Sequence, residues 1–166
     1  GGRELIFADC GLIVAPDAAQ LADIARTSAR SALSLTGRAE LALLSFSNFG
    51  NPNREKALRI REAVEILDRR NVDFEYDGEM SADVALNPEL HKLYPFCRLT
   101  GAANILIMPA LHSANISYKL MQELSGASVI GPLLIGLEKP AQIVQMGATV
   151  SDIVNAAALA AHDAVR

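Results

Sequence analysis

Residues Gln142 to Val154 contain the side chains best suited by type and spacing to chemistry. The sequence there is typical of an apolar strand, a turn at Gly147 and a helix that begins near Thr149. Ligands often bind at such junctions, because the first N–H groups of a helix have no partner within the helix. Asp152 is the carboxylate of this segment that could act as a general base. The segment is therefore the first candidate site.

Asp152 also has a purely structural interpretation. Thr149 and Asp152 have the spacing of a capping box, in which each side chain accepts a hydrogen bond from the other residue's backbone N–H. Lys119 has two interpretations as well, as a point charge for a phosphate group or as a solvated helix lysine. The sequence leaves these alternatives open.

Two further polar segments follow apolar runs, Ser47 to Asn53 and Pro109 to Lys119. Open α/β sheets bind ligands at the carboxyl ends of their strands, so the three segments are expected to converge at one sheet edge. Helix starts after Gly50 and Ser113 could receive an anion. Each of these signals is weak alone, because no Walker-type or GxGxxG motif accompanies it.

The histidines and cysteines lack the spacing of a metal site, so no metal is expected. These residues are His91, His112, His162, Cys10 and Cys97. Two cysteines in a chain of this type are typical of free thiols in a reducing compartment. The expected location is the cytoplasm.

Composition limits the class of protein and its partners. A chain of 166 residues with 51% hydrophobic residues can bury roughly 70% of its unfolded surface, enough for one core. Aromatic residues make up only 5%, so Ala, Val, Ile and Leu must build that core, as in α/β proteins. The net charge of −4 argues against a nucleic-acid partner. No apolar run reaches the ~20 residues that span a bilayer, so no membrane partner is expected.

Short apolar runs alternate with segments of helical period, which predicts an α/β protein with a mostly parallel sheet. A capping box at Asp17 and Gln20 starts the first helix, which ends at Gly37. Later helices are expected through Ala57 to Leu67, from Ser81 with an interruption at Pro88, from Ser113 to Leu124, and from Thr149 onward. Strands are expected at Leu5 to Ala8, Leu41 to Phe46, Asp73 to Asp77, Asn104 to Met108, Val129 to Ile135 and Ala141 to Met146.

The last two predicted strands flank Lys139-Pro140, a connection too short for a crossover helix. They are therefore expected to pair antiparallel, which makes the sheet mixed. The predicted fold class is a three-layer α/β/α sandwich with a mostly parallel mixed sheet. Residues 1–166 are expected to form a single α/β lobe.

Four stretches together resemble the carboxyl half of the phosphate acetyl/butyryl transferases, enzymes that exchange acetyl between coenzyme A and phosphate. They are Asn104 to Lys119, Gly131 to Gly136, Lys139-Pro140 and Gln142 to Val154. The resemblance implies an isocitrate/isopropylmalate dehydrogenase-like fold. It also implies that 1–166 is a fragment of a longer chain and the second lobe of a phosphotransacetylase unit.

One difference from that family concerns the phosphate. Gln145-Met146 stands where the family has a Ser-Arg pair, so the guanidinium that would neutralise phosphate is absent. Losing such a contact in the transition state is expected to cost on the order of 3 kcal/mol or more. We therefore expect binding of acetyl-CoA without catalysis, and no catalytic residue. The effector-binding residues that the resemblance implies are Asn115, Lys119, Gln145, Met146, Gly147 and Asp152.

Four motifs in order resemble the phosphotransacetylase-like carboxyl-terminal domain of large bacterial NADP-dependent malic enzymes. They are Ser45 to Gly50, Asp77 to Leu86, Tyr94-Pro-Phe96 and Gly147 to Val150. This resemblance implies a parent that oxidatively decarboxylates malate to pyruvate, with NADP and a divalent metal in another domain. The fragment itself would hold no cofactor, would sense acetyl-CoA as an effector, and would belong to a homo-oligomer, a dimer or larger.

Two alternatives accompany this hypothesis. The first is an active phosphate acetyltransferase that uses an arginine from an absent lobe. The second is a structural domain whose apolar helices chiefly build the oligomer.

Overall fold

The computed structural model describes residues 4–9, 11–126 and 128–165. It divides into two compact units, Gly1–Ile116 and Ser117–Arg166, named unit 1 and unit 2 below. The sequence had predicted a single lobe. Each unit is described by itself.

Unit 1 is built on a parallel sheet in the order β1-β4-β2-β3. Its strands are β1 (Ile6–Ala8), β2 (Glu40–Leu44), β3 (Glu75–Met80) and β4 (Ile105–Ile107). In the register, Ile105 of β4 lies opposite both Ile6 and Leu41. All four strands were predicted, within a few residues at each end.

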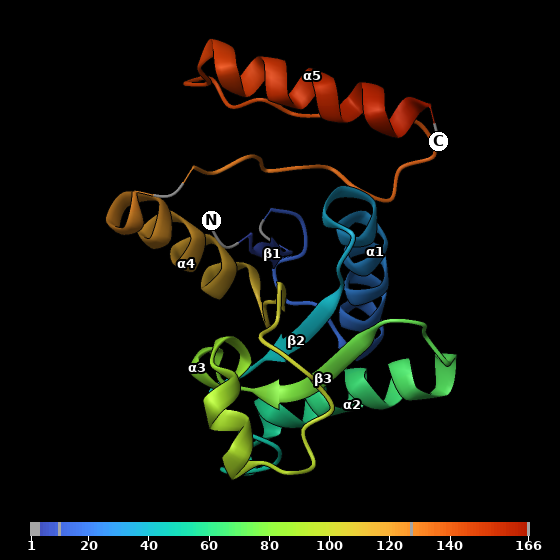
Figure 1. Cartoon of the computed structure of the whole chain (residues 1–166), viewed down its shortest axis with the longest axis vertical. Helices are drawn as coiled ribbons and strands as arrows, with labels where there is room; N and C mark the ends of the chain where they lie inside the picture. The colour runs from blue at the N-terminus through green and yellow to red at the C-terminus, as the bar shows by residue number, and fades with distance from the viewer. Residues whose placement is uncertain (1–3, 10, 127, 166) are drawn as a thin grey trace. The chain divides into compact units, whose positions relative to one another are not determined.

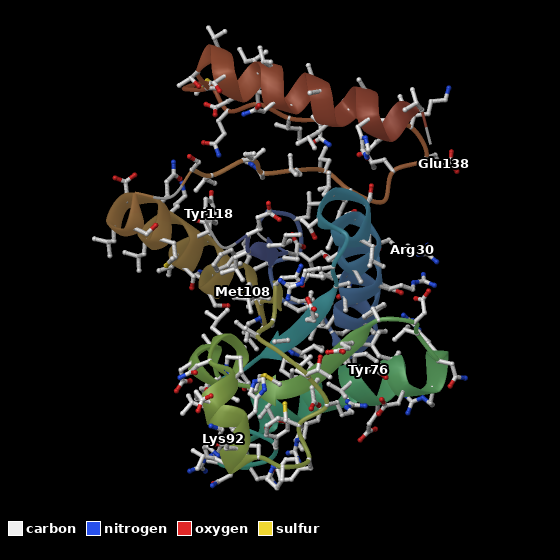
Figure 2. The ribbon with its side chains drawn as sticks, viewed as in Figure 1. Arg30, Tyr76, Lys92, Met108, Tyr118 and Glu138 are labelled. Atoms are coloured by element: carbon white, nitrogen blue, oxygen red, sulfur yellow. The ribbon has the colours of Figure 1, made fainter. Side chains whose placement is uncertain are left out.

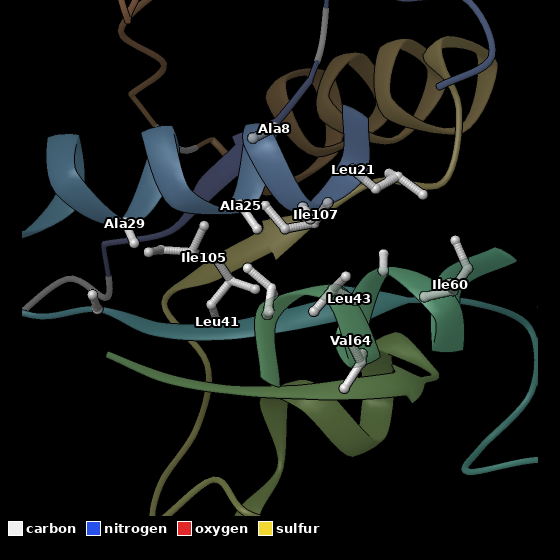
Figure 3. Close-up of a cluster of buried hydrophobic side chains, with 14 of the residues drawn as sticks. Ala8, Leu21, Ala25, Ala29, Leu41, Leu43, Ile60, Val64, Ile105 and Ile107 are labelled. Atoms are coloured by element: carbon white, nitrogen blue, oxygen red, sulfur yellow. The ribbon is translucent and has the colours of Figure 1, made fainter. Parts of the chain in front are cut away.

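Helices cover both faces of this sheet, because its strands are apolar on both sides. Leu41, Leu43, Ile105 and Ile107 face α1 (Ala18–Thr36) and α2 (Glu55–Arg70) in one core. Figure 3 shows Ala25 and Ala29 of α1 above Leu41 and Ile105, where small side chains let the helix approach closely. The predicted three-layer arrangement is present in unit 1.

The opposite face carries a second core. Ala42, Leu44 and Leu106 pack there with Val84 and Ala85 of α3 (Ala82–Leu86). The 3-10 helix η1 (Pro88–Leu93) follows α3, since Pro88 interrupts the helical run as predicted. Figure 1 shows α1 and α2 on one side of β2 and β3 and α3 on the other.

The ends of α1 follow from its sequence. Asp17 accepts a hydrogen bond from the Gln20 N–H at 2.8 Å, and Gln20 accepts one from the Asp17 N–H at 2.9 Å. Gly37 ends the helix with a φ of 73°, a conformation that glycine adopts without strain. The predicted capping box and C-terminal glycine are both confirmed.

Helix α4 (Leu111–Ser125) begins earlier than predicted. Ser113 lies inside its first turn and donates from Oγ to the Ala110 carbonyl at 2.7 Å. The predicted helix start at Ser113 was therefore wrong: its hydroxyl bonds a carbonyl and does not cap the free N–H groups of the helix start. Gly126, with a φ of 64°, follows the helix as expected.

The mixed sheet is the second correction. Residues 128–149 contain no strand, and the described ladders of the sheet are all parallel. The predicted strands Val129 to Ile135 and Ala141 to Met146 are extended segments without a β-ladder. Apolar sequence favours extension, but a strand also needs a partner for its backbone groups.

Unit 2 consists of the carboxyl part of α4, these extended segments and α5 (Val150–Ala164). Among its described residues none is buried. In contrast to unit 1, the described part of unit 2 has no core of its own. Across the described ranges, no helix is long and apolar enough to cross a membrane.

Candidate functional site

A hollow in unit 2 contains the first candidate site. It is bordered by α4, both extended segments and the start of α5. Tyr118, which Figure 2 labels on α4, lies in its wall. Three of the predicted effector-binding residues also line it: Gln145, Gly147 and Asp152. The strand-to-helix segment singled out in the sequence therefore borders a concave surface.

The other predicted site residues lie outside this hollow. The lining does not include Met146, whose side chain is fully exposed. Lys119 is exposed, with its Nζ 5.5 Å from the centre of the Tyr118 ring. Asn115 belongs to unit 1. The structure thus brings three of the six predicted residues together.

Asp152 forms the capping box that the sequence predicted as one alternative. Its Oδ2 accepts hydrogen bonds from the backbone N–H and the hydroxyl of Thr149, both at 2.8 Å, and its own N–H donates to Thr149 Oγ1 at 3.2 Å. The backbone and side-chain hydrogen bonds from Thr149 lower the pKa of Asp152. A carboxylate stabilised in this way is a weaker base, so the geometry favours capping over proton abstraction.

The charge of the hollow is the feature most relevant to a ligand. Its described lining contains no Lys, Arg or His, and Asp152 is its charged group. The polar groups present are the side chains of Tyr118, Gln122, Gln145 and Asn155. Neutral amides and hydroxyls suit an amide-bearing or carbonyl-bearing ligand better than an isolated phosphate.

The extended segments of unit 2 are joined by one side chain. The Gln142 amide accepts from the Leu134 N–H at 3.0 Å and donates to the Leu134 carbonyl at 3.1 Å. A side-chain amide thus makes the pair of hydrogen bonds that a neighbouring strand would otherwise make. It holds the two walls of the hollow together.

Unit 1 has a second polar cluster at the carboxyl end of β2. Glu79 is fully buried; its Oε1 accepts from Ser47 Oγ and from the Gly50 N–H, both at 2.9 Å. The guanidinium of Arg61 on α2 lies 3.3 Å from Glu79 Oε2. Glu79 fixes the loop after β2, because its carboxylate accepts hydrogen bonds from a side chain of that loop, at Ser47, and from the loop backbone, at Gly50.

Arg59 connects this region to the end of β4. Its Nη2 donates to the Pro109 carbonyl at 2.8 Å, so α2 lies against the start of α4 in unit 1. The Ser47 to Asn53 and Pro109 segments are thus at the same edge of the sheet, as predicted. The third predicted segment, Gln145 to Asp152, lies in unit 2, and its convergence with the other two stays a prediction.

A third polar cluster joins the segment after η1 to β3 and α2. Arg98 Nη1 lies 2.6 Å from Asp68 Oδ1, and its Nη2 lies 3.3 Å from the buried Asp77. Tyr76 donates to Asp68 at 2.6 Å. Partial burial, together with the hydrogen bond to Asp68, raises the pKa of Tyr76 to about 12. Burial alone would raise the pKa of Asp68, but the hydrogen bonds from Tyr76 and Arg98 lower it.

Sequence reasoning missed Glu79 and Arg61 as members of a cluster. One signal was available: Glu79 lies two residues after Asp77, just beyond the predicted strand Asp73 to Asp77, and in a longer strand these two positions share one face. Acidic residues on a covered face need cationic or N–H partners. Among the described residues, no group of three or more His, Cys, Asp and Glu is placed to hold a metal ion.

The chain is similar in sequence to two kinds of protein. It is 55% identical over 163 residues to an NADP-dependent malic enzyme from Rhizobium meliloti (strain 1021), covering 98% of this chain and 21% of the relative. It is 46% identical to a phosphate acetyltransferase from Treponema pallidum (strain Nichols), covering 96% of this chain and 49% of the relative. The chain spans about half the length of such acetyltransferases and about a fifth of the malic enzyme.

Solved structures agree with this similarity. A phosphotransacetylase from Streptococcus pyogenes matches with a TM-score of 0.94 and 36% identity, covering 99% of this chain and 50% of that one. The EutD phosphotransacetylase from Staphylococcus aureus matches with a TM-score of 0.91 and 33% identity, covering 99% and 51%. The α/β fold expected from the sequence is therefore confirmed.

A family profile described as phosphate acetyl/butaryl transferase matches residues 1–161, nearly the whole chain. This match agrees with the family resemblance found in the sequence. The chain belongs to the phosphate acetyl/butaryl transferase family.

Proposed function

We propose that this chain is the acetyl-CoA-sensing, oligomer-forming region of an NADP-dependent malic enzyme and does not transfer acetyl groups itself. The single observation that carries the proposal is the absence of a cation in the described lining of the hollow beside Gln145 and Gly147. Met146, which stands where the family has an arginine, offers a thioether that cannot neutralise phosphate. Binding of a neutral part of acetyl-CoA does not need that charge.

The state of Asp152 supports the same conclusion. An acetyl transfer to coenzyme A needs a base for the thiol, and Asp152 is the carboxylate in the hollow. Its oxygen is engaged by Thr149 and its pKa is lowered, so it is a poor proton acceptor near neutral pH. Binding of acetyl-CoA without acetyl transfer is consistent with the missing cation and with the hydrogen-bonded carboxylate of Asp152.

The proposed regulation takes place in the longer protein. Acetyl-CoA binding is expected to favour a less active arrangement of the oligomer, for which 1 to 3 kcal/mol of coupling is typical. The malate chemistry, with NADP and a divalent metal, would lie in another domain. We expect the protein in the cytoplasm, in keeping with the free thiol of Cys97.

The first test measures acetyl-CoA formation from acetyl phosphate and coenzyme A, with the full-length protein. We expect no formation above the rate without protein. Acetyl exchange that Asp152→Asn abolishes would contradict the proposal.

A second test measures acetyl-CoA binding by calorimetry and malic enzyme activity with and without acetyl-CoA. Lys119→Ala is expected to weaken binding several-fold if its charge meets the phosphates of coenzyme A. Lys92→Ala is the matched control, because Lys92 is also exposed but pairs with Glu89 in unit 1. Acetyl-CoA sensitivity that survives deletion of this region would reject the regulatory role.

A phosphate acetyltransferase is the second candidate function. The specific observation in its favour is the 46% identity to the Treponema pallidum enzyme over 96% of this chain. An arginine from outside these 166 residues would then have to supply the missing charge. The acetyl phosphate assay separates the two functions.

A further inference from the structure

The segment that follows η1 in unit 1, residues 94–100, contains a tight turn directly before an arginine. The Cys97 N–H donates to the Tyr94 carbonyl at 2.8 Å, which closes a four-residue turn with Pro95 at its second position. Proline fixes a backbone angle there, so the turn has little freedom to change its shape. Figure 1 shows this segment passing β3 before it reaches β4.

Arg98 clamps the 94–100 segment to both faces of the sheet. Its N–H donates to Asp77 Oδ2 at 2.7 Å, and its guanidinium lies 3.3 Å from Asp77 Oδ1 and 2.6 Å from Asp68 Oδ1 of α2. The guanidinium also lies 4.7 Å from the centre of the Tyr76 ring. Tyr76 and Asp77 are neighbours in β3, so their side chains point to opposite faces. Arg98 therefore wraps around the edge of β3, the terminal strand of the sheet.

Thr100 gives the segment a second anchor on β3. Its N–H and its hydroxyl donate to the Glu75 carboxylate at 3.0 and 2.9 Å. Between the two anchors, Leu99 is buried in the core on the α3 face of the sheet. The N–H groups of Arg98 and Thr100 are bonded to side chains of β3. These bonds can therefore break without disturbing the ladder between β2 and β3.

The turn places two aromatic rings against the loop that follows β2. The centre of the Phe49 ring lies 5.2 Å from that of Tyr94 and 5.1 Å from that of Phe96. Phe49 has a φ of 49°, a left-handed conformation that a bulky residue adopts only under constraint. Its N–H also donates to the Glu79 carbonyl at 2.8 Å. The two ring contacts and this hydrogen bond supply the constraint.

We propose that residues 94–100 act as a latch for the loop Ser47 to Asn53, and that latch and loop open together. While Arg98 is clamped around β3, the turn holds Phe49 in its strained conformation and the loop stays closed. When Arg98 leaves, the rings separate and the Phe49 backbone leaves the left-handed region. The loop lies at the same sheet edge as Pro109, so its opening changes the surface on which a ligand would meet unit 1.

The first test follows amide exchange by NMR in this chain and in Arg98→Ala. The N–H groups of residues 48–51 in the loop and of residues 97, 98 and 100 in the latch are hydrogen-bonded, so their exchange reports opening. We expect Arg98→Ala to lower the protection of both sets by the same factor, at least about tenfold, because the closed state loses hydrogen bonds to charged groups. Loss in the latch alone, or in neither set, would overturn the proposal.

Two substitutions outside the latch serve as controls. Ile105→Ala removes a buried side chain of β4 that stays packed whether the latch is open or closed. It is expected to lower protection in β4 and to leave residues 48–51 unchanged, since an equal loss there would mean that the loop opens only by global unfolding. Arg69→Ala removes an exposed arginine of α2 that pairs with Glu65 at 3.9 Å. A loss in this variant like that in Arg98→Ala would attribute the effect to net charge and reject the latch.

The reciprocal test starts from the loop, and it decides the question even if Arg98→Ala does not fold. Coupling between two sites acts equally in both directions, so Phe49→Ala is expected to lower the protection of residues 97, 98 and 100 about as much as that of its own loop. Phe46→Ala is the matched control, because this ring is 59% exposed and makes none of the ring contacts above. Unchanged latch amides in Phe49→Ala would contradict the coupling. None of these readouts involves acetyl-CoA, so they are independent of the proposed function.

Discussion

Units 1 and 2 have similar apolar content but use it in opposite ways. Unit 1 places its Leu and Ile side chains in two cores on either side of a complete sheet. Unit 2 exposes such side chains on α5 and on two extended segments. The hydrophobicity of a segment therefore does not show by itself whether the segment forms a stable core. The backbone of the segment also needs hydrogen-bond partners such as neighbouring strands, and the described part of unit 2 has no such strands.

The largest expected effect contrasts one isoleucine from each unit. Ile105→Ala removes a fully buried side chain that contacts α1 and β2, and should cost about 3 kcal/mol in the free energy of unfolding. Ile143→Ala should change it by less than about 0.5 kcal/mol in this chain, because the side chain is exposed. Urea unfolding followed by circular dichroism measures both. Equal losses would show that unit 2 has a core.

The next prediction concerns charge pairs of unequal burial. Glu79→Gln removes the negative charge that accepts hydrogen bonds from Ser47 and Gly50 and pairs with Arg61. This substitution is expected to lower the free energy of unfolding by about 2 kcal/mol. Glu65→Gln is its matched control, because Glu65 forms an exposed pair with Arg69 at 3.9 Å. The control should cost under about 0.5 kcal/mol. Similar costs would mean that Glu79 does not organise the loop after β2.

Alkaline pH provides a test within unit 1. Tyr76 has its pKa raised to about 12 by burial and by Asp68, so the folded state holds the phenol proton more tightly than the unfolded state, whose pKa is about 10. The stabilisation is complete below pH 10 and disappears between about pH 10 and 12. Because Tyr76 is partly exposed, about 1 kcal/mol is expected. Tyr76→Phe should flatten the pH dependence of the melting temperature in this range.

The smallest effect lies at the start of α5. Thr149 lowers the pKa of Asp152, so the stabilisation by the cap is fully present above the unfolded pKa, near 4, and is lost as pH falls through the lower pKa of the folded state. The protection of amides in the first turn of α5, relative to the intrinsic exchange rate at each pH, should therefore fall below about pH 4. Asp152→Asn should remove this dependence without changing exchange in α1. If the protection of these amides in the unsubstituted chain did not change with pH, Asp152 would not act as the cap.

Local signals in the sequence predicted local structure well. The capping boxes at Asp17 and Thr149 are present because their hydrogen bonds join residues three apart. Strands β1 to β4 were located by apolar runs covered on both faces. Ser113 was misplaced because a serine hydroxyl can also bond the carbonyl three residues earlier, as it does at Ala110.

Features that depend on distant partners were beyond prediction. The buried state of Glu79 requires Arg61 and Ser47, which are brought to it by the packing of α2 and the loop after β2. The strand character of residues 129–135 was visible in the sequence, but a ladder needs a second strand, which no local pattern specifies. For the candidate site, the strand-to-helix segment was found, whereas Tyr118 and Asn155 of its lining were not.

The order of the sheet has a consequence for synthesis on the ribosome. Strands β2 and β3 are neighbours joined by one helix, so they can pair early, whereas β1 pairs with β4. Strand β1 therefore stays without its hydrogen-bonded neighbour until β4, near the end of unit 1, has emerged. During that interval its open edge is available to other nascent chains, and chaperone capture of this short segment would protect the folding protein from aggregation.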